Sequence, residues 1–315
     1  MKKILLIGAG FIGTNFYKLF KDKYDITIMD IGDYPCTLEN GMWDLGEKKY
    51  IHADIDSYQL KGAVETTKPD YIINMAASSH VDRSIHENHT FLNTNTLGVE
   101  GLMKAVIGKK IKVIQFSTDE VYGDTPVDSL ERSNETDRLI PSSPYSASKA
   151  AADMVVSAYV RTFGVDVVTV RPTNNYGPYQ YPEKLIPFLI KREAEGKTLP
   201  IYGIGDNIRE WLFVEDCCRA VEMLLEKGVS GEIYNIGSGE RLSNLQVVNY
   251  IGDKSRWEFV ADRPGHDRRY AVNSSKIRAL GWEPEINFEQ GILITKHWYF
   301  KRLELIKQLE ANKHI

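Results

Sequence analysis

Two side chains with a spacing suited to proton transfer are Tyr145 and Lys149. Four residues along a helix bring two side chains onto one face. A lysine cation close to a tyrosine favours the phenolate and lowers the tyrosine pKa from about 10. Such a tyrosine takes a hydroxyl proton while a hydride leaves the same carbon for a nicotinamide. The alternative is an amphipathic helix that contains this pair by chance, but Pro144, a residue typical of a first helical turn, favours the functional interpretation.

A pair of adjacent carboxylates, Asp119 and Glu120, follows the apolar run at 112–117. Two neighbouring carboxylates can act as a general acid and a general base if burial raises one pKa more than the other. The alternative is a solvated loop at the end of a strand. The position of the pair between a buried strand and the tyrosine–lysine segment favours catalysis.

A glycine-rich turn follows the first apolar run, with Gly8, Gly10, Phe11, Ile12 and Gly13 in sequence. Between a strand and a helix, the three glycines permit a tight turn, a close approach to a pyrophosphate and close packing of the helix. The N–H groups at the start of that helix then point at the phosphates. The pattern predicts a dinucleotide site.

The acid Asp30 ends the second apolar run, about 20 residues after the first glycine. A carboxylate there accepts hydrogen bonds from ribose hydroxyls and repels a 2′-phosphate, which favours NAD over NADP. A simple turn former is the alternative interpretation. Asp54 and Ile55, after the third apolar run, are candidates for contact with adenine, although a turn would also explain Asp54.

The elements that must position these side chains alternate between short apolar runs and helical patterns. The predicted strands are 3–7, 25–29, 50–53, 71–75, 112–117 and 165–171, and the predicted helices are 10–20, 57–65, 91–106 and 144–163. This alternation predicts an α/β fold, a Rossmann-like, doubly wound parallel sheet with helices on both faces. Ligands then bind at the carboxyl ends of the strands, where the strand order switches.

The pattern changes after the strand at 165–171, where prolines crowd the chain. Further elements are predicted as a helix at 185–195, strands at 199–201 and 206–214, a helix at 216–225, a strand at 232–236 and a charged helix from 288 that forms a solvated amphipathic cap. We expect a cofactor domain at 1–172, to which the chain returns at about 213–237, and a smaller α/β substrate-binding region at 173–315.

The composition excludes several classes of protein. The chain of 315 residues has a formal net charge of −4 with scattered charges, so neither nucleic acid nor an anionic membrane is an expected partner. The absence of a signal segment and the adjacent Cys217 and Cys218 favour a reduced, cytoplasmic protein. His86 and His89 lack a third ligand, so no metal is expected.

Together, these motifs resemble the extended short-chain dehydrogenase/reductases, the nucleotide-sugar epimerase and dehydratase family. The segments 117–123, 174–187 and 262–270 are similar to the signatures of the dTDP-glucose 4,6-dehydratase subfamily, and the likeness runs from about Lys3 to Pro284. Two departures from the family pattern are Ile7, where a glycine is usual, and Ser78, where the dehydratases commonly carry glutamate.

The resemblance implies a dehydration that begins and ends with hydride transfer to and from NAD. Tyr145, assisted by Lys149, would take the proton of the sugar 4-hydroxyl, and Thr118 would hydrogen-bond O4. The resulting ketone acidifies C5–H, which Glu120 would remove. Asp119 would protonate the leaving 6-hydroxyl.

The resemblance also assigns binding residues. Further cofactor contacts are expected from Ala76, Ala77, Thr94 and Asn175. Contacts to the nucleotide sugar are expected from Ser79, Asn174, Lys184, Leu185, Pro200, Tyr202, Arg209, Asn244, Arg263 and His266. The guanidinium of Arg209 suits a diphosphate. For His266 the alternative is a loop histidine bonded to backbone.

Three functions remain open from the sequence: dehydration of a dTDP-sugar, the same reaction on a UDP-sugar or a 4-epimerisation, and a non-catalytic NAD sensor. The helices predicted at 91–106 and 144–163 carry much apolar surface. The resemblance implies a homodimer in which they form a four-helix bundle; alternatively, they only cover the sheet.

Overall fold

The first strand shows how the sequence produces a sheet with helices on both faces. The computed structural model describes residues 1–32, 49–79, 84, 88–125, 130–262, 268–304, 306 and 307. In β1 (Lys3–Ile7), Ile4 and Leu6 pack into one apolar cluster with α1 (Phe11–Phe20) and α8 (Val214–Lys227). Leu5 and Ile7 point the other way into a second cluster. A strand buried on both faces needs a continuous apolar run, which β1 has.

The main sheet has seven strands in the order β10-β6-β5-β4-β1-β2-β3, and every neighbouring pair is parallel. Its other strands are β2 (Asp25–Asp30), β3 (Lys49–His52), β4 (Tyr71–Asn74), β5 (Lys112–Phe116), β6 (Asp166–Pro172) and β10 (Ile233–Ile236). The strand order switches between β1 and β4, so the carboxyl ends of these strands form the expected ligand crevice. The predicted doubly wound α/β fold is confirmed.

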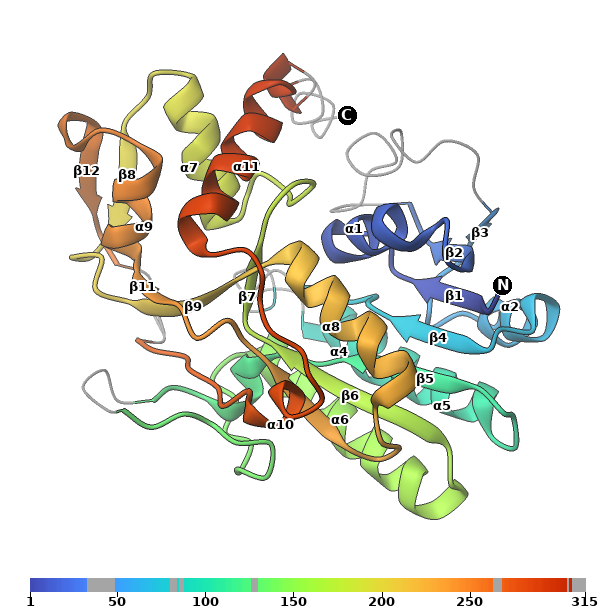
Figure 1. Ribbon diagram of the computed structural model, residues 1–315. Helices are drawn as coiled ribbons and strands as arrows, with labels where there is room; N and C mark the ends of the chain where they lie inside the picture. The colour runs from blue at the N-terminus through green and yellow to red at the C-terminus, as the bar shows by residue number, and fades with distance from the viewer. Residues whose placement is uncertain are drawn as a thin grey trace.

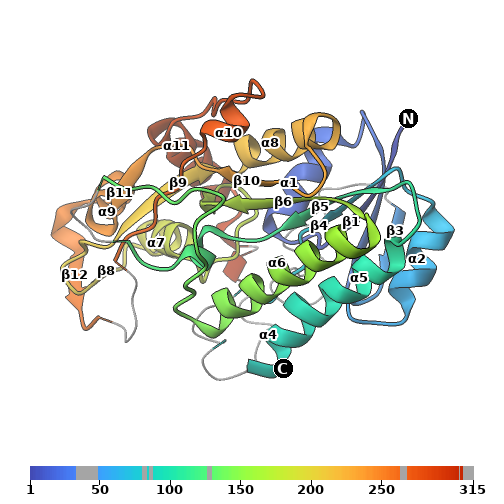
Figure 2. The ribbon, with the colours of Figure 1, turned by 90° about the horizontal axis from the view of Figure 1, so that it is seen from below.

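Helices cover both faces of this sheet. One face carries α1 and α8, and the other carries a layer of α2, α4, α5, α6 and the π-helical segment η3 (Figure 1 and Figure 2). The bounds of this layer are α2 (Gln59–Thr67), α4 (Asn88–Leu92), η3 (Asn93–Leu97), α5 (Gly98–Val106) and α6 (Pro144–Phe163). The helix predicted at 91–106 therefore begins earlier and contains a π segment, which an apolar pattern does not reveal.

The second half of the chain builds a smaller α/β region beside the sheet (Figure 1). Its strands form two small sheets, one of β11 (Arg241–Ser243), β9 (Ile208–Phe213) and β7 (Asn174–Tyr176), the other of β12 (Trp257–Val260) and β8 (Leu199–Tyr202). Its helices are α7 (Leu185–Ala194), α9 (Asn244–Ile251) and α11 (Phe288–Phe300), whereas α10 (Ser275–Arg278) packs against the main sheet through Ile277. The bounds predicted for the helices and strands of this half differ from the observed ones by a few residues.

The last helix, α11, was expected to be a solvated amphipathic cap. Phe288, Ile292 and Tyr299 are buried in the apolar cluster of the smaller region. One face of the helix is therefore part of that core. No helix among the described residues has the length and apolar character to cross a bilayer, and those residues hold no cluster of metal-ligating side chains.

Candidate active site

The glycine turn has the geometry of a phosphate-binding loop. Gly8 has a φ of +89°, and a Cβ on it would lie 2.4 Å from the backbone nitrogen of Ala76. A Cβ on Gly13 would lie 2.1 Å from the carbonyl oxygen of Gly8. A Cβ on Gly10 meets nothing within 4 Å, so the turn leaves open space there for a ligand. Ile7, where the family usually has glycine, is buried in the core and ends β1.

Replacing Gly8 and Gly10 by alanine separates folding from cofactor binding. We expect Gly8→Ala to lower the free energy of unfolding by about 1–3 kcal/mol, because of its positive φ and the backbone clash. Gly10→Ala is expected to unfold like the wild type but to bind NAD at least about 10-fold more weakly, because the methyl group fills ligand space. Thermal unfolding and a fluorescence titration with NAD measure the two effects. Unchanged NAD affinity in Gly10→Ala would contradict the assignment of this turn.

Asp30 lies at the carboxyl end of β2 and is buried. Its two carboxylate oxygens accept hydrogen bonds from the N–H groups of Ala9 and Gly32, each at 2.7 Å. Burial raises the pKa of this carboxyl, and the two backbone hydrogen bonds oppose the shift. Because each carboxylate oxygen can accept more than one hydrogen bond, Asp30 retains the capacity to bind ribose hydroxyls.

The neighbouring adenine candidates have local structural roles. The Asp54 side chain accepts a hydrogen bond from the N–H of Asp56 at 3.4 Å, and its carbonyl accepts one from Ser57 at 3.2 Å. Asp54 therefore forms the turn that the sequence analysis gave as the alternative to an adenine contact. Ile55 is buried against the start of α5 at Gly98.

Tyr145 and Lys149 lie on the first turns of α6, which begins with a capping box and a proline. The Lys149 Nζ donates to the Phe116 carbonyl at 2.6 Å, and burial lowers the Lys149 pKa to about 8. Burial and the nearby Glu120 raise the pKa of Tyr145, opposed by a hydrogen bond to Thr118. The sequence predicted a lowered tyrosine pKa, but burial raises it, and the Lys149 ammonium group binds the Phe116 carbonyl.

Asp119 begins a single 3-10 turn, η4 (Asp119–Tyr122), and its side chain is buried. One carboxylate oxygen, Oδ2, has no hydrogen-bond partner among the described residues, and Oδ1 accepts from the Thr118 hydroxyl at 3.3 Å. Burial and the charges of Glu120 and Glu210 raise the pKa of Asp119 well above its usual value. Asp119 is therefore not part of a solvated loop, and its burial favours the protonated carboxyl.

The raised pKa of Asp119 predicts a gain in stability when the charge is removed. A carboxyl that binds its proton more tightly when folded stabilises the protein fully below its usual pKa, and this contribution is lost as the pH rises through the folded-state pKa. We expect Asp119→Asn to raise the free energy of unfolding by about 1–3 kcal/mol at a pH of about 8, with a smaller gain at about 4. Denaturant unfolding at both values tests this, with the exposed Asp22→Asn as the control. A less stable Asp119→Asn protein at the higher pH would contradict the assigned charge state.

The residues expected to bind substrate come from several elements. The Lys184 Nζ donates to the Ser79 carbonyl at 3.0 Å, which joins the smaller region to the segment after β4. The Asn174 and Asn175 side-chain oxygens are buried without hydrogen-bond partners among the described residues. Arg209 is buried, and its guanidinium carbon lies 4.7 Å from the Tyr270 ring centroid. Its charge lowers the pKa of Asp119.

The remaining candidates are more dispersed. Leu185 begins α7, Asn244 begins α9, and Pro200 and the exposed Tyr202 lie in β8. The partly buried cofactor candidates Ala76 and Ala77 follow β4, and Thr94 lies in η3. Arg263 and His266 lie outside the described residues.

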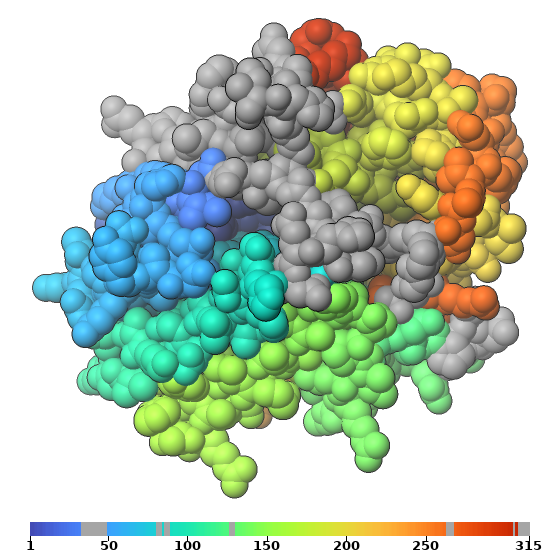
Figure 3. Space-filling view, turned by 180° about the vertical axis from the view of Figure 1, so that it is seen from behind, coloured from blue at the N-terminus to red at the C-terminus, as the bar shows by residue number. Residues whose placement is uncertain are grey.

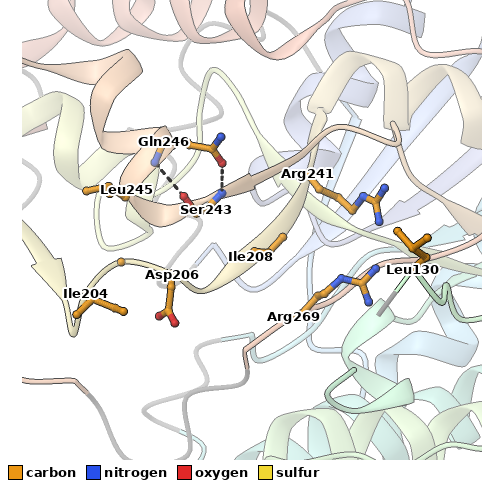
Figure 4. Close-up of a pocket in the computed structure, with 10 residues that line it drawn as sticks. Leu130, Ile204, Asp206, Ile208, Arg241, Ser243, Leu245, Gln246 and Arg269 are labelled. Atoms are coloured by element: carbon orange, nitrogen blue, oxygen red, sulfur yellow. Dashed lines mark hydrogen bonds between the residues drawn. The ribbon is translucent and has the colours of Figure 1, made fainter. Parts of the chain in front are cut away.

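A cavity of about 700 Å³ lies beside β9 (Figure 4). Ile208, Arg241, Ser243 and Arg269 are among the residues that line it. None of the expected site residues is among its described lining residues.

Sequence analysis missed a buried amide that orders the site. The Asn95 side chain accepts a hydrogen bond from the Ser78 N–H at 2.9 Å and donates to the Ser78 carbonyl at 3.0 Å. It also donates to the Ser148 hydroxyl at 2.9 Å, and that hydroxyl donates to the Tyr145 carbonyl at 2.7 Å. The only sequence signal is a polar residue on the buried face of a predicted helix.

Comparison with known proteins agrees with this geometry. The sequence pattern of the family described as GDP-mannose 4,6 dehydratase matches residues 7–295. The chain belongs to this family. Low-salt glycan biosynthesis protein Agl12 of Haloferax volcanii is a relative that is 43% identical over 302 residues, which cover 93% of this chain and 96% of that protein. The family resemblance inferred from the sequence is confirmed.

Two further members of the 4,6-dehydratase family match along nearly their whole length. The dTDP-glucose 4,6-dehydratase of Salmonella typhimurium is 41% identical over 350 residues, covering 100% of this chain and 97% of that protein. The crystal structure of dTDP-glucose 4,6-dehydratase from Bacillus anthracis in complex with NAD has a TM-score of 0.90 and 39% identity, and covers 98% of this chain and 100% of that one.

Proposed function

We propose that this protein is an NAD-dependent hydro-lyase that converts dTDP-glucose to dTDP-4-keto-6-deoxyglucose. The observation that carries this proposal is the acid pair: Asp119 is buried with a raised pKa, Glu120 follows it, and Thr118 links their turn to Tyr145. Besides the tyrosine that both reactions use at O4, elimination of water needs a base for the C5 proton and a proton donor for the 6-hydroxyl, whereas 4-epimerisation needs neither of these two groups. The relatives named above support dTDP-glucose as the substrate.

The residues present fit NAD. When bound, NAD accepts a hydride from C4 of the sugar and returns it to C6. The turn of Gly8, Gly10, Phe11, Ile12 and Gly13 would hold the pyrophosphate, and Asp30 would bind ribose and disfavour a 2′-phosphate. The remaining cofactor contacts would come from Asp54, Ile55, Ala76, Ala77, Thr94, Tyr145, Lys149 and Asn175.

The side chains around the sugar would then move protons in a balanced sequence. Tyr145 takes the proton of the 4-hydroxyl, and Thr118 donates a hydrogen bond to O4. The C4 ketone acidifies C5–H, and Glu120 removes that proton. Asp119 protonates the 6-hydroxyl, which leaves as water. Glu120 exchanges this proton with solvent and returns a proton to C5 as C6 is reduced, and the proton gained by Tyr145 balances the one lost by Asp119.

The smaller region would hold the nucleoside diphosphate. Arg209 and Lys184 supply positive charge, and the buried side-chain oxygen of Asn174, which has no hydrogen-bond partner within the described part of the chain, would accept a hydrogen bond from a substrate hydroxyl. We assign residues 1–172 and the returning segment at about 213–237 to the cofactor domain and the remainder of 173–315 to the substrate-binding region. Leu185, Pro200, Tyr202, Asn244, Arg263 and His266 complete the proposed pocket.

We further infer a homodimer through a four-helix bundle. The helices α5 and α6 lie on the outer surface of the molecule (Figure 3). Their layer exposes Leu92, Leu97, Met154 and Phe163, each between 45% and 56% exposed. Apolar side chains gathered on one face are typical of an interface. A monomer mass by light scattering at micromolar concentration would contradict this assembly.

The buried free thiols of Cys217 and Cys218 support a cytoplasmic location.

The direct test of the activity is incubation of the purified protein with dTDP-glucose and, separately, UDP-glucose. We expect loss of one water from dTDP-glucose, seen by mass spectrometry, together with a 4-keto product. Water loss from UDP-glucose alone would retain the chemistry and overturn the nucleotide. Bound NAD without water loss from any nucleotide hexose would overturn the dehydratase assignment.

A further inference from the structure

A buried ion pair lies directly behind the candidate active site. Asp153 and Arg171 are both nearly inaccessible to solvent, and Asp153 Oδ2 accepts from the Arg171 Nη2 at 2.8 Å and Nε at 3.0 Å. The Ser117 hydroxyl donates to the same oxygen at 3.0 Å. Burying two charges carries a large desolvation penalty, so an ion pair of this kind is weak evidence for stability and better evidence for positioning.

The arginine of this pair also holds the turn that carries the two carboxylates. Arg171 Nη1 donates to the Tyr122 hydroxyl at 2.8 Å, and the guanidinium carbon lies 4.8 Å from the Tyr122 ring centroid. The Tyr122 hydroxyl in turn donates to the Asn235 side-chain oxygen in β10 at 2.7 Å. Because Tyr122 ends η4, which begins with Asp119 and Glu120, these contacts fix the orientation of that turn.

The aspartate of the pair belongs to the helix that carries the tyrosine and lysine. Asp153 lies one helical turn after Lys149 and two turns after Tyr145, on the same face of α6. The chain of contacts from Asp153 through Arg171 to Tyr122 therefore joins the two groups of reactive side chains through the interior. It contains no residue that the proposed mechanism uses.

We propose that Tyr122, held by Arg171 and Asp153, is a positioning residue for the elimination step. This inference rests on the proposed function. Tyr122 orients Asp119 and Glu120 toward the sugar C5 and C6, while α6 orients Tyr145 toward O4. Loss of the Tyr122 hydroxyl loosens the turn that carries Asp119 and Glu120 and leaves Tyr145 in place. A displacement of about 1 Å at reacting atoms can slow a reaction about 10²-fold.

The test is Tyr122→Phe, with separate measurement of C4 oxidation and of water loss. In single turnovers with NAD and dTDP-glucose, we expect water loss to slow by about 10–100-fold. C4 oxidation, followed by the absorbance of reduced nicotinamide, is expected to stay within about 3-fold, so the reduced cofactor accumulates. Rapid quenching with mass spectrometry gives the rate of water loss and of solvent deuterium uptake at C5. Tyr24→Phe is the matched control, because its buried hydroxyl donates to Glu222 at 2.7 Å far from the site.

Arg171→Lys provides an independent variant if Tyr122→Phe folds poorly. Lysine keeps the charge opposite Asp153 but lacks the planar fork that bonds Asp153 and Tyr122 together. The same accumulation of reduced cofactor is expected. Equal slowing of both steps, or no change in either, would overturn the positioning role in proteins that fold normally. A wild type that releases no water would instead refute the proposed function.

Discussion

Glu120→Gln is expected to reduce water loss from dTDP-glucose by about 10³-fold while C4 oxidation continues. The reason is that glutamine keeps the size and polarity of the side chain but cannot accept the C5 proton. The 4-keto intermediate then forms and accumulates, so reduced nicotinamide persists in a single turnover. Stopped-flow absorbance and rapid-quench mass spectrometry on the same sample measure the two quantities.

A surface carboxylate is the control for this substitution. Glu65→Gln removes an acid from the exposed side of α2 and is expected to leave both rates unchanged. Retained water loss in Glu120→Gln would show that another group takes the C5 proton. Loss of both steps together would place Glu120 in substrate binding instead.

Tyr145→Phe is expected to reduce overall turnover by about 10³–10⁴-fold and to abolish the reduced-nicotinamide signal. Without the phenol, nothing takes the 4-hydroxyl proton, so the first step fails and no ketone forms. Burial raises the pKa of Tyr145, and the positive charge of a bound nicotinamide would lower it again. NAD affinity, measured by titration, is expected to stay within about 3-fold of the wild type.

The contrast between these two variants separates the possible functions. A 4-epimerase would lose activity with Tyr145→Phe but retain it with Glu120→Gln. A sensor would bind NAD in both variants and convert no sugar in either. A strong signal of reduced cofactor in Tyr145→Phe would contradict the role of the tyrosine.

Local pattern was sufficient to predict much of this molecule. The continuous apolar run of β1 specifies a strand buried on both faces, and a glycine at position 8 is required by a positive φ that other residues rarely adopt. The order of strand, turn and helix then places Asp30, Asp119 and Tyr145 at one edge of the sheet. These are properties of short segments, which a sequence displays directly.

Features that depend on distant packing could not be predicted in the same way. The pKa of Tyr145 rises because the folded chain buries it, and the buried face of α11 faces residues more than a hundred positions earlier in the chain. The π segment that turns Asn95 inward, and the contacts of Tyr122 with Arg171, arise only when helices and strands meet. Each depends on contacts between residues that lie far apart in the sequence.

The central claim is an internal redox loop, and the fate of the C4 hydrogen tests it most directly. The protein should be incubated with dTDP-glucose carrying deuterium at C4, and the product position of the label determined by NMR. We predict deuterium at C6 of a 4-keto-6-deoxy product within the same molecule, and a solvent-derived hydrogen at C5. Deuterium that stays at C4 of an unaltered or inverted sugar, or that is lost from the product, would contradict the account.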